Sequence, residues 1–450
     1  MPGIPAPLLG LNANEPINGM KPAHAIRLSN WVCRQGGLYV RNGFGVQSLG
    51  LGSSPLALMS WPGATQALFA TTATGLWNVT SASASYILPL QAGYGNASSA
   101  IQTNGGPTTL LFVNGKDGLF AYRGATWSLM TVTGCDATKW QQIIIHQRRV
   151  FAHDGARVWY LDANAIAGPA HPVIMEQHFR NGNVIAGIAS IKPSGGIGPD
   201  NILAVVTATG ELAIYEGDNP KLATNFSGKG VFDVPLPVTR NAFIEHGTTA
   251  MLVTRDGILP IPDILQLDRA KKPVGAITND IQGLWDLAWS QNAAANLGGY
   301  AGLNSGSARF DLITVPGNGT FVRPPETGGW SILDGLNATC WLDDSRRLYF
   351  GRTDGTVCLY GGQDDAGQPI NALMVGAFQA LGANRSPARA RLTFDRHTGY
   401  RPLFKVLTNY REVRLMRGCS TRSDWTGRTA TSPCATRDWC PAWKAMTSIC

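Results

Sequence analysis

The sequence predicts a mainly β protein, organised as a β-propeller-like repeat of six or seven blades. Two observations concern composition: the 450 residues include 53 glycines, and only 15% of the residues are charged. Amphipathic helices need charged outer faces, whereas strands joined by tight turns use glycine. The third observation is an internal repeat of β-hairpins, and its spacing sets the number of blades.

Six segments share one pattern: an apolar run, a turn centred on glycine, and a second run rich in aromatic or β-branched residues. Their central glycines are Gly75, Gly118, Gly155, Gly210, Gly257 and Gly355. Asp-Gly and Thr-Gly sequences supply the positive φ that a tight hairpin requires. Each segment therefore predicts one β-hairpin.

The spacing of these glycines is typical of propeller blades, which repeat at about 40–50 residues. Successive glycines are 43, 37, 55, 47 and 98 residues apart. Because the last spacing is about twice the others, we expect one degenerate copy at 305–315. A succession of hairpins in two β-sandwiches remains the alternative.

One helix interrupts the repeat near 278–290. Apolar residues recur there at helical spacing, at Ile281, Leu284, Trp285, Ala288 and Trp289. Thr278 or Asn279 is placed to cap its start. Such an aromatic stripe usually faces a core. Trp285 and Trp289 are also our candidates for anchors of a subunit interface.

The composition argues against several classes of protein. No run of 18 or more apolar residues is present, so we expect no membrane-spanning helix. The first residues lack the basic and apolar regions of a signal peptide. We therefore expect the cysteines to be reduced thiols. No two of the eight cysteines form a C-x-x-C pair, which argues against a zinc ribbon or thioredoxin-like site.

Positive charge is concentrated at the C-terminal end. Residues 385–450 contain 13 Lys and Arg against 4 Asp and Glu, a net charge of +9, whereas the first 384 residues contain 24 against 25. Arginines here alternate with aromatic residues, a pattern that suits either phosphate contacts or an interface between subunits. The candidates are Arg385, Arg389, Arg391, Arg401, Arg411, Arg414 and Arg417.

We find no catalytic motif, and we therefore expect no enzyme activity, cofactor, metal ion or small-molecule substrate. Zincin, P-loop, nucleophile-elbow and EF-hand patterns are all absent from the sequence. The adjacent acids Asp343–Asp344 and Asp364–Asp365 do not form glycosidase pairs by themselves, because neighbouring residues on a strand point to opposite faces.

Two stretches contain motifs that resemble a known family. Residues 14–44 include a Gly-x-x-x-Arg-x-Gly turn, and 313–362 include a Thr-Gly-x-Trp turn and a Tyr-Phe-Gly-x-x-Asp-Gly hairpin. In this order and spacing, the motifs resemble the tail nozzle proteins of short-tailed bacteriophages (podoviruses), also called tail tubular protein B or packaged-DNA stabilisation protein. The residues are Gly37, Arg41, Gly43, Thr327, Gly328, Trp330, Tyr349, Phe350, Gly351, Asp354 and Gly355.

The resemblance covers about residues 14–410 and implies a structural virion protein. Such a protein forms a cyclic homo-oligomer, expected to be a hexamer, below the portal and adaptor, binds a tail fibre or spike, and closes the channel for double-stranded DNA until infection. It is assembled in the host bacterial cytoplasm. The alternative is a carbohydrate- or receptor-binding propeller of a phage tail spike or fibre.

The resemblance also implies a division of the chain into four parts. A small β platform would combine an N-terminal segment, 1–50, with a C-terminal segment, 363–417. The propeller would occupy 51–362, with the helix inserted in it. Residues 418–450 depart from the family pattern and show neither strand nor helix periodicity. They are either a strain-specific extension or the product of a reading-frame shift.

Overall fold

The computed structural model describes most of the chain up to residue 380. The described ranges are 5–63, 65–103, 106–175, 178–191, 201–222, 225–239, 241–246, 249–266, 275–292, 297–303, 309–344, 347–380, 406–408, 411–412 and 446–449. Everything below refers to these residues.

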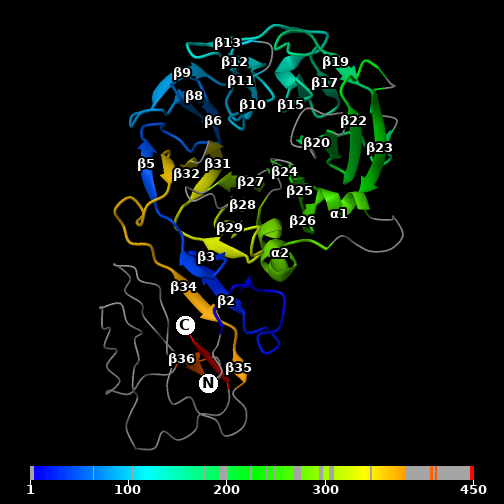
Figure 1. Cartoon of the computed structure of the whole chain (residues 1–450). Coiled ribbons are helices and arrows are strands. Elements are labelled where there is room, and N and C mark those ends of the chain that lie inside the picture. The colour runs from blue at the N-terminus through cyan, green and yellow to red at the C-terminus, as the bar shows by residue number, and fades with distance from the viewer. Residues whose placement is uncertain are drawn as a thin grey trace, which may run out of the picture.

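Seven β-sheets stand around one centre in this part of the chain (Figure 1). Five of these sheets have four strands, one has three, and one has seven, of which four form the blade. This arrangement confirms the prediction of a propeller with six or seven blades. Blade 1 contains β6 (Ala57–Trp61), β7 (Ala67–Thr71), β8 (Gly75–Asn78) and β9 (Ser85–Pro89). Blade 2 contains β10 (Ser98–Gln102), β11 (Thr109–Val113), β12 (Phe120–Tyr122) and β13 (Trp127–Leu129). Blade 3 contains β15 (Gln142–His146), β16 (Arg149–His153), β17 (Val158–Tyr160) and β19 (His171–Val173).

Blades 4 to 7 complete the ring. Blade 4 contains β20 (Ile185–Ile191), β21 (Ile202–Thr207), β22 (Glu211–Gly217) and β23 (Phe226–Asp233), and blade 5 contains β24 (Phe243–His246), β25 (Thr249–Thr254) and β26 (Gly257–Pro260). Blade 6 contains β27 (Gly298–Leu303), β28 (Arg309–Val315), β29 (Gly319–Arg323) and β30 (Ser331–Leu333). Blade 7 contains β31 (Ala338–Asp344), β32 (Arg347–Arg352), β33 (Val357–Tyr360) and, as its outer strand, β5 (Phe44–Ser48).

Each predicted hairpin joins the second and third strands of a blade. Five of the six central glycines have positive φ, from +81° at Gly355 to +124° at Gly257; Gly75 instead begins β8. The degenerate copy expected at 305–315 is the β28–β29 hairpin of blade 6, which turns at Gly317. The doubled spacing in the sequence thus corresponds to an additional blade.

The first strand of each blade contacts the first strand of the next, from β6 round to β31 and back to β6. Side chains connect some of these inner strands. Gln142 of blade 3 donates from Nε2 to the carbonyl oxygen of Ile188 at 2.9 Å and accepts from its N–H at 2.8 Å. Ser98 of blade 2 accepts from the N–H of Ile143 at 3.1 Å. These bonds satisfy backbone groups that the sheets themselves leave unpaired.

The core lies between neighbouring blades. Each hydrophobic cluster of the described residues joins side chains of adjacent blades, and the largest also includes Trp285 and Trp330. Fully burying one large apolar side chain contributes roughly 1.5–3 kcal/mol. The packing between blades therefore stabilises the ring as a whole.

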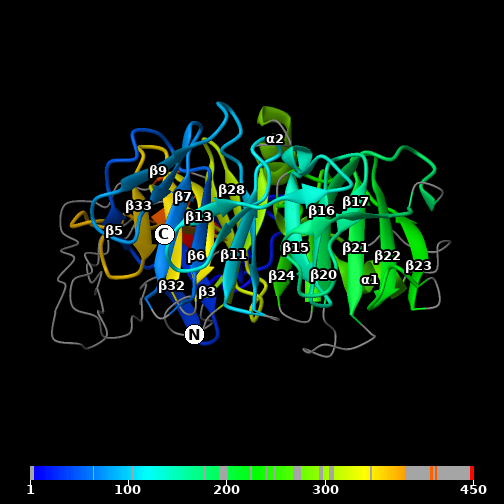
Figure 2. The same cartoon turned by 90° about the horizontal axis from the view of Figure 1, so that it is seen from above.

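Blade 5 has three strands among the described residues, and a helical segment lies beside the third. The helices are α1 (Ile261–Gln266), the 3-10 turn η3 (Asn279–Ile281) and α2 (Gln282–Gln291), which projects at one face of the ring (Figure 2). The N–H of Ile277 donates to the carbonyl oxygen of Ile258 on β26 at 3.0 Å, and so covers part of the strand edge. Thr278 makes no cap bond; its hydroxyl accepts from the Ile258 N–H at 3.3 Å.

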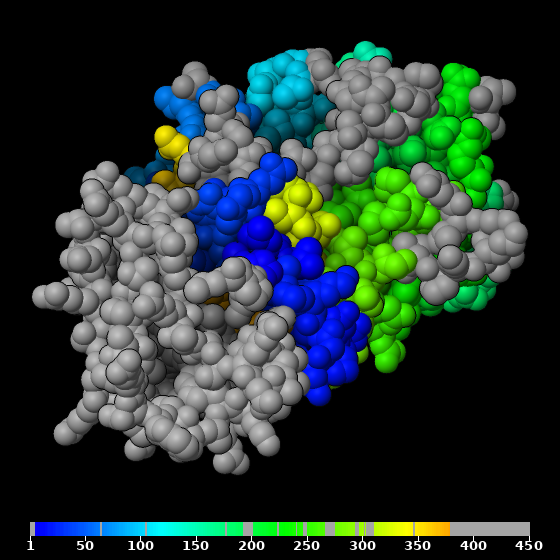
Figure 3. Space-filling view, turned by 60° about the horizontal axis from the view of Figure 1, so that its bottom comes forward, coloured from blue at the N-terminus to red at the C-terminus, as the bar shows by residue number. Residues whose placement is uncertain are grey.

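Strands from both ends of the chain extend blade 6 outward. The sheet continues from β30 to β2 (His24–Ser29), which pairs with β1 (Gly10–Leu11) in parallel and with β34 (Leu373–Gly376) in antiparallel orientation. A hairpin of β3 (Trp31–Arg34) and β4 (Gly37–Val40) follows β2. Figure 3 shows this N-terminal segment, in blue, on the surface beside blades 5 and 6.

A few short elements lie outside these sheets. The turn η1 is Ala137–Lys139, and β14 (Val132–Thr133) pairs in parallel with β18 (Gly168–Pro169). A small sheet contains β35 (Gln379–Ala380), β36 (Val406–Thr408), β37 (Arg411–Glu412) and β38 (Met446–Ile449). The strand β38 lies in the 418–450 tail, where the sequence pattern predicts none. The boundaries at 50, 363 and 418 stay predictions, although β5 begins inside the 1–50 segment and belongs to blade 7.

Candidate functional site

Arg41 connects three parts of the chain that are distant in sequence. Its side chain is 1% exposed and forms two parallel bonds to Asp365, of 2.8 and 2.7 Å. It also donates to Asn30 Oδ1 at 2.8 Å and to the carbonyl oxygens of Asp334 and Asn42, both at 2.9 Å. A guanidinium has five N–H donors, and these five bonds use them all. We call this group, with Asn30, the Arg41 junction.

Asn30 and Gly43 complete the junction on either side of Arg41. Asn30 accepts from the N–H of Asp334 at 2.7 Å and donates to the carbonyl oxygen of Asn371 at 2.7 Å. A Cβ on Gly43 would lie 1.7 Å from the carbonyl oxygen of Asp364. Only glycine therefore allows the segment that enters blade 7 to pass so close to the segment that leaves it.

The Thr-Gly-x-Trp motif lies at the adjoining turn between β29 and β30. The hydroxyl of Thr327 donates to the carbonyl oxygen of Cys33 at 2.9 Å, and Gly328 has φ +71°. Trp330 is 1% exposed, and its Nε1 donates to the carbonyl oxygen of Ile277 at 2.8 Å. This turn therefore connects the N-terminal hairpin, blade 6 and the segment before α2.

The third motif forms the β32–β33 hairpin of blade 7. Its residues are Tyr349, Phe350, Gly351, Asp354 and Gly355. The ring of Phe350 packs edge-on against Phe44 of β5, with centroids 5.4 Å apart. Asp354 accepts from the N–H and hydroxyl of Thr356 at 3.1 and 2.6 Å, which shapes the turn. The motif thus supports the strand that closes the ring.

The three motifs therefore meet at one joint, where the N-terminal segment and the residues between Asp365 and β34 reach blades 6 and 7. Their polar side chains are engaged in bonds within the protein, and the large apolar ones are buried. Such an arrangement positions parts of the chain. It holds the N-terminal segment to the C-terminal segment through Asp365 and to blade 6 through Asp334 and Thr327, all by contacts more than 290 residues apart.

The candidate arginines of the C-terminal segment lie outside the described residues, with one partial exception. Arg411 belongs to β37, and its backbone pairs with that of Thr408 on β36. The side chain of Arg411 is not described. Their assignment to nucleic acid or to a subunit interface stays a prediction.

The two tryptophans of α2 differ in their surroundings. Trp285 is 1% exposed, and its Nε1 donates to the carbonyl oxygens of Thr254 and Arg255 at 3.1 and 2.8 Å. It belongs to the core, as its place in the apolar stripe predicts, and is not available as an anchor. Trp289 is partly buried against the same cluster.

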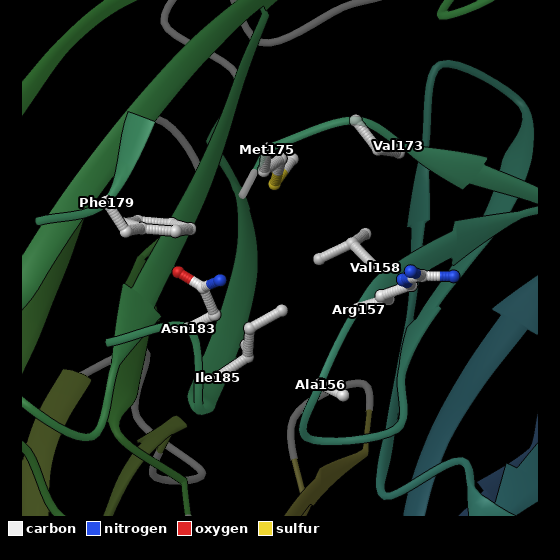
Figure 4. A pocket seen from close by; sticks show the side chains of 8 residues that line it. All are labelled: Ala156, Arg157, Val158, Val173, Met175, Phe179, Asn183 and Ile185. Carbon is white, nitrogen blue, oxygen red and sulfur yellow. The ribbon is translucent and has the colours of Figure 1, made fainter. Parts of the chain in front are cut away.

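A small cavity lies between blades 3 and 4 (Figure 4). Val158 and Val173 line it on one side, and Phe179 and Asn183 line it on the other. Its volume is about 10 Å³. A single water needs about 10–15 Å³, so this cavity is too small for an organic ligand.

A larger hollow of about 250 Å³ lies at the outer side of blade 4, and we call it the blade 4 depression. It is lined by His178, Arg180, Tyr215, Gly228, Lys229, Gly230 and Val231. His178 Nδ1 and Tyr215 Oη are 2.6 Å apart. Sequence reasoning missed this site, because its residues come from two strands and the loop before β20 and form no local motif.

A buried carboxylate holds the loop that carries His178 and Arg180. Glu211 is fully buried, and its two oxygens accept from the N–H of Arg180 at 3.0 and 3.1 Å. One of them also accepts from the N–H of Asn181 at 3.0 Å. Hydrogen bonds from backbone N–H groups satisfy a buried carboxylate without a cation. The loop is therefore anchored to blade 4.

Burial alters the titration of several core groups. It lowers the pKa of His153 to about 4, an effect that Asp154 partly opposes, and raises the pKa of Tyr215 to about 12. Across the described ranges, no three His, Cys, Asp or Glu side chains are placed to hold a metal ion. In the same ranges, no helix has the length and apolar character needed to cross a lipid bilayer.

Comparisons with solved structures return propellers and extracellular domains. One is the extracellular domain of a putative one-component system, BT4673, of B. thetaiotaomicron, with 13% identity, a TM-score of 0.47, and coverage of 71% of this chain and 40% of that one. The WD40 propeller of Doa1 has 10% identity and a TM-score of 0.43, and the match covers 71% of this chain and 97% of that one. BBS1N bound to ARL6DN has 8% identity and a TM-score of 0.46, with the same two coverages. No protein-family model and no curated protein matches the sequence.

Proposed function

We propose that this protein is the tail nozzle subunit of a short-tailed bacteriophage. Copies of the chain form a ring below the portal and adaptor, retain the packaged DNA, and conduct it during infection. The motifs that resemble the nozzle family support this proposal, since residues from three separate stretches of the sequence meet at one joint.

The observation that carries the proposal is the outward extension of blade 6. A closed propeller needs no further strands, yet β1, β2 and β34 continue one of its sheets beyond the ring (Figure 1). Both chain ends contribute to this extension. It provides a surface for assembly that is separate from the blades, and a ring subunit needs such surfaces to contact its neighbours and the adaptor.

The charge distribution is compatible with a conduit. The first 384 residues have a net charge of −1. A strongly cationic lumen would bind DNA phosphates and slow the passage of a duplex. We therefore expect the arginines of the C-terminal segment to lie away from the narrowest part of the channel.

The mass of the assembled particle tests this proposal. A hexamer of the 48.0 kDa chain has a mass of about 288 kDa. We expect native mass spectrometry to find this species for the full-length chain, alone or after addition of a portal–adaptor complex. A monomer or trimer that does not associate with the portal–adaptor complex would contradict the proposal.

The blade 4 depression favours a second candidate function, that of a carbohydrate- or receptor-binding propeller in a spike or fibre. Spikes are expected to be trimeric or monomeric, so the same mass measurement separates the two candidates. Ligand binding alone does not, because a ring subunit can also bind a ligand on an outer blade.

A further inference from the structure

Two positions of one strand, both glycines, leave room for the blade 4 depression. Gly228 and Gly230 lie on β23, the outermost strand of blade 4. A Cβ on Gly228 would lie 3.4 Å from Tyr215 Cε1 and 3.5 Å from His178 Cε1, in ordinary contact. Any longer side chain at this position would therefore occupy the space above these two rings.

Two aromatic rings, those of His178 and Tyr215, line one wall of the depression. His178 stacks on Tyr215 with centroids 5.8 Å apart and 25° between planes, and Tyr215 stacks on Phe226 at 5.4 Å and 9°. Tyr215, in the middle, is 3% exposed, whereas His178 at the end of the stack is partly exposed. The apolar C–H face of a sugar ring packs well on such a surface, as other apolar groups do.

Positive charge surrounds the same hollow. Lys229 contributes an ammonium group that Glu216 contacts at 2.9 Å, so its charge is largely balanced. The exposed side chain of Arg180 has no ion-pair partner among the described residues. A guanidinium binds a carboxylate through two parallel hydrogen bonds. Arg180 is therefore the group that would select an acidic ligand.

We propose that the blade 4 depression binds one acidic sugar residue, such as a uronate unit of a bacterial surface polysaccharide. Drug-sized ligands occupy pockets of about 300–1,000 Å³, and the 250 Å³ here suits a single sugar ring. The partly exposed ring of His178, stacked on Tyr215, provides a surface for the sugar ring, and Arg180 provides a partner for its carboxylate. A free phosphate would use the charge and leave the rings uncovered. The site belongs to blade 4 of a single chain, so this inference does not rest on the nozzle proposal.

Titration calorimetry of the full-length chain tests this assignment. The probes are tetrasaccharides of galacturonate, glucuronate and mannuronate, with neutral maltotetraose and inorganic phosphate for comparison. We expect at least one uronate tetramer to bind at least about tenfold more tightly than maltotetraose and phosphate, because only it uses both the rings and Arg180. Binding of none of the uronates, or equal affinity for phosphate, would overturn the proposal.

Two variants locate the binding. Gly228→Leu fills the hollow, and Arg180→Gln removes the exposed charge; each should weaken uronate binding by about tenfold or more. Lys116→Gln is the matched control, since Lys116 is a cation 5.9 Å from the ring of Tyr94 and lies outside blade 4. Arg180 is exposed, so its variant tests the site even if Gly228→Leu misfolds. Native affinity in Arg180→Gln would overturn the assignment.

Discussion

Arg41 makes more specific contacts than any other polar side chain we describe at the joint, and its replacement should be costly. We expect Arg41→Lys to lower the free energy of unfolding by about 3–5 kcal/mol, because an ammonium has three N–H donors for the five bonds that Arg41 makes and leaves buried acceptors unpaired. Thermal and urea unfolding of the two proteins measure this loss. The shift in the midpoint should accompany faster proteolysis of the segment after β33.

A surface ion pair provides the control for this prediction. Lys221 and Asp162 are 2.7 Å apart, with side chains 45% and 44% exposed. Lys221→Ala should change the free energy of unfolding by no more than about 1 kcal/mol, since exposed pairs contribute little. Equal effects of the two substitutions would mean that the Arg41 junction does not contribute to stability in the way its geometry indicates.

His153 should make the stability of the protein depend on pH. Burial lowers the pKa of this imidazole to about 4, against about 6.5 in the unfolded chain. Below pH 6.5 the unfolded chain takes up a proton that the folded protein does not, so stability falls by about 3 kcal/mol as pH drops from 6.5 towards 4. We expect His153→Asn, which retains an acceptor for the N–H of Gly155, to show a shallower decline in urea titrations.

Measurement at pH 7.5 separates this effect from any packing defect. Both residues are neutral there, so the difference between the two proteins reports packing alone. The slope between pH 6.5 and 4 then reports the proton. If the native protein and His153→Asn lose stability in parallel over this range, other groups cause the decline.

The strand β5 closes the ring, and Gly43 at its start should be sensitive to any side chain. Gly43→Ala should lower the free energy of unfolding by about 1–3 kcal/mol or more, because its methyl group would clash with the carbonyl oxygen of Asp364. Gly45→Ala, two residues further along and within β5, is the matched control, with nothing within 4 Å of the added methyl group. Thermal unfolding and limited proteolysis near β5 should respond to the first substitution alone.

The sequence predicted the blades well because their hairpins are local. A glycine with positive φ between two apolar runs determines the turn without help from the rest of the chain, as at Gly118, Gly155 and Gly210. Even the degenerate copy of blade 6 could be inferred, because the length of the gap indicated it. The helix at α2 was found in the same way, from a repeat of apolar residues over three turns.

The pairing of distant strands could not be predicted from such patterns. Nothing in the sequence of β5 shows that it joins β33, or in that of β2 that it joins both β30 and β34. The bond from Arg41 to Asp365 spans 324 positions, and no local pattern connects the two residues. The blade 4 depression was missed for the same reason, since its shape depends on how Gly228 of β23 lies against Tyr215 and His178.

The molecule as a whole combines an almost neutral propeller with a basic C-terminal segment. The repeats and the joint at Arg41 account for the fold of the first part, and neither needs nucleic acid. The net charge of +9 in residues 385–450 therefore requires a separate explanation. Two explanations are open: contact with DNA phosphates, or pairing with acidic residues of a neighbouring subunit.

A full-length variant with the seven candidate arginines of this segment replaced by glutamine distinguishes these explanations. We expect the variant to remain monomeric under conditions where the native chain assembles, and to bind a DNA duplex as weakly as the native chain does, because a conduit should not hold its passenger. Native mass spectrometry measures the first effect, and fluorescence anisotropy at several salt concentrations measures the second. Each phosphate contact contributes about −0.9 to the slope of log affinity against log salt for duplex DNA. The opposite result would be a steep salt dependence for the native chain that becomes shallower by several such contributions in the variant, with unchanged assembly. That result would assign these arginines to DNA.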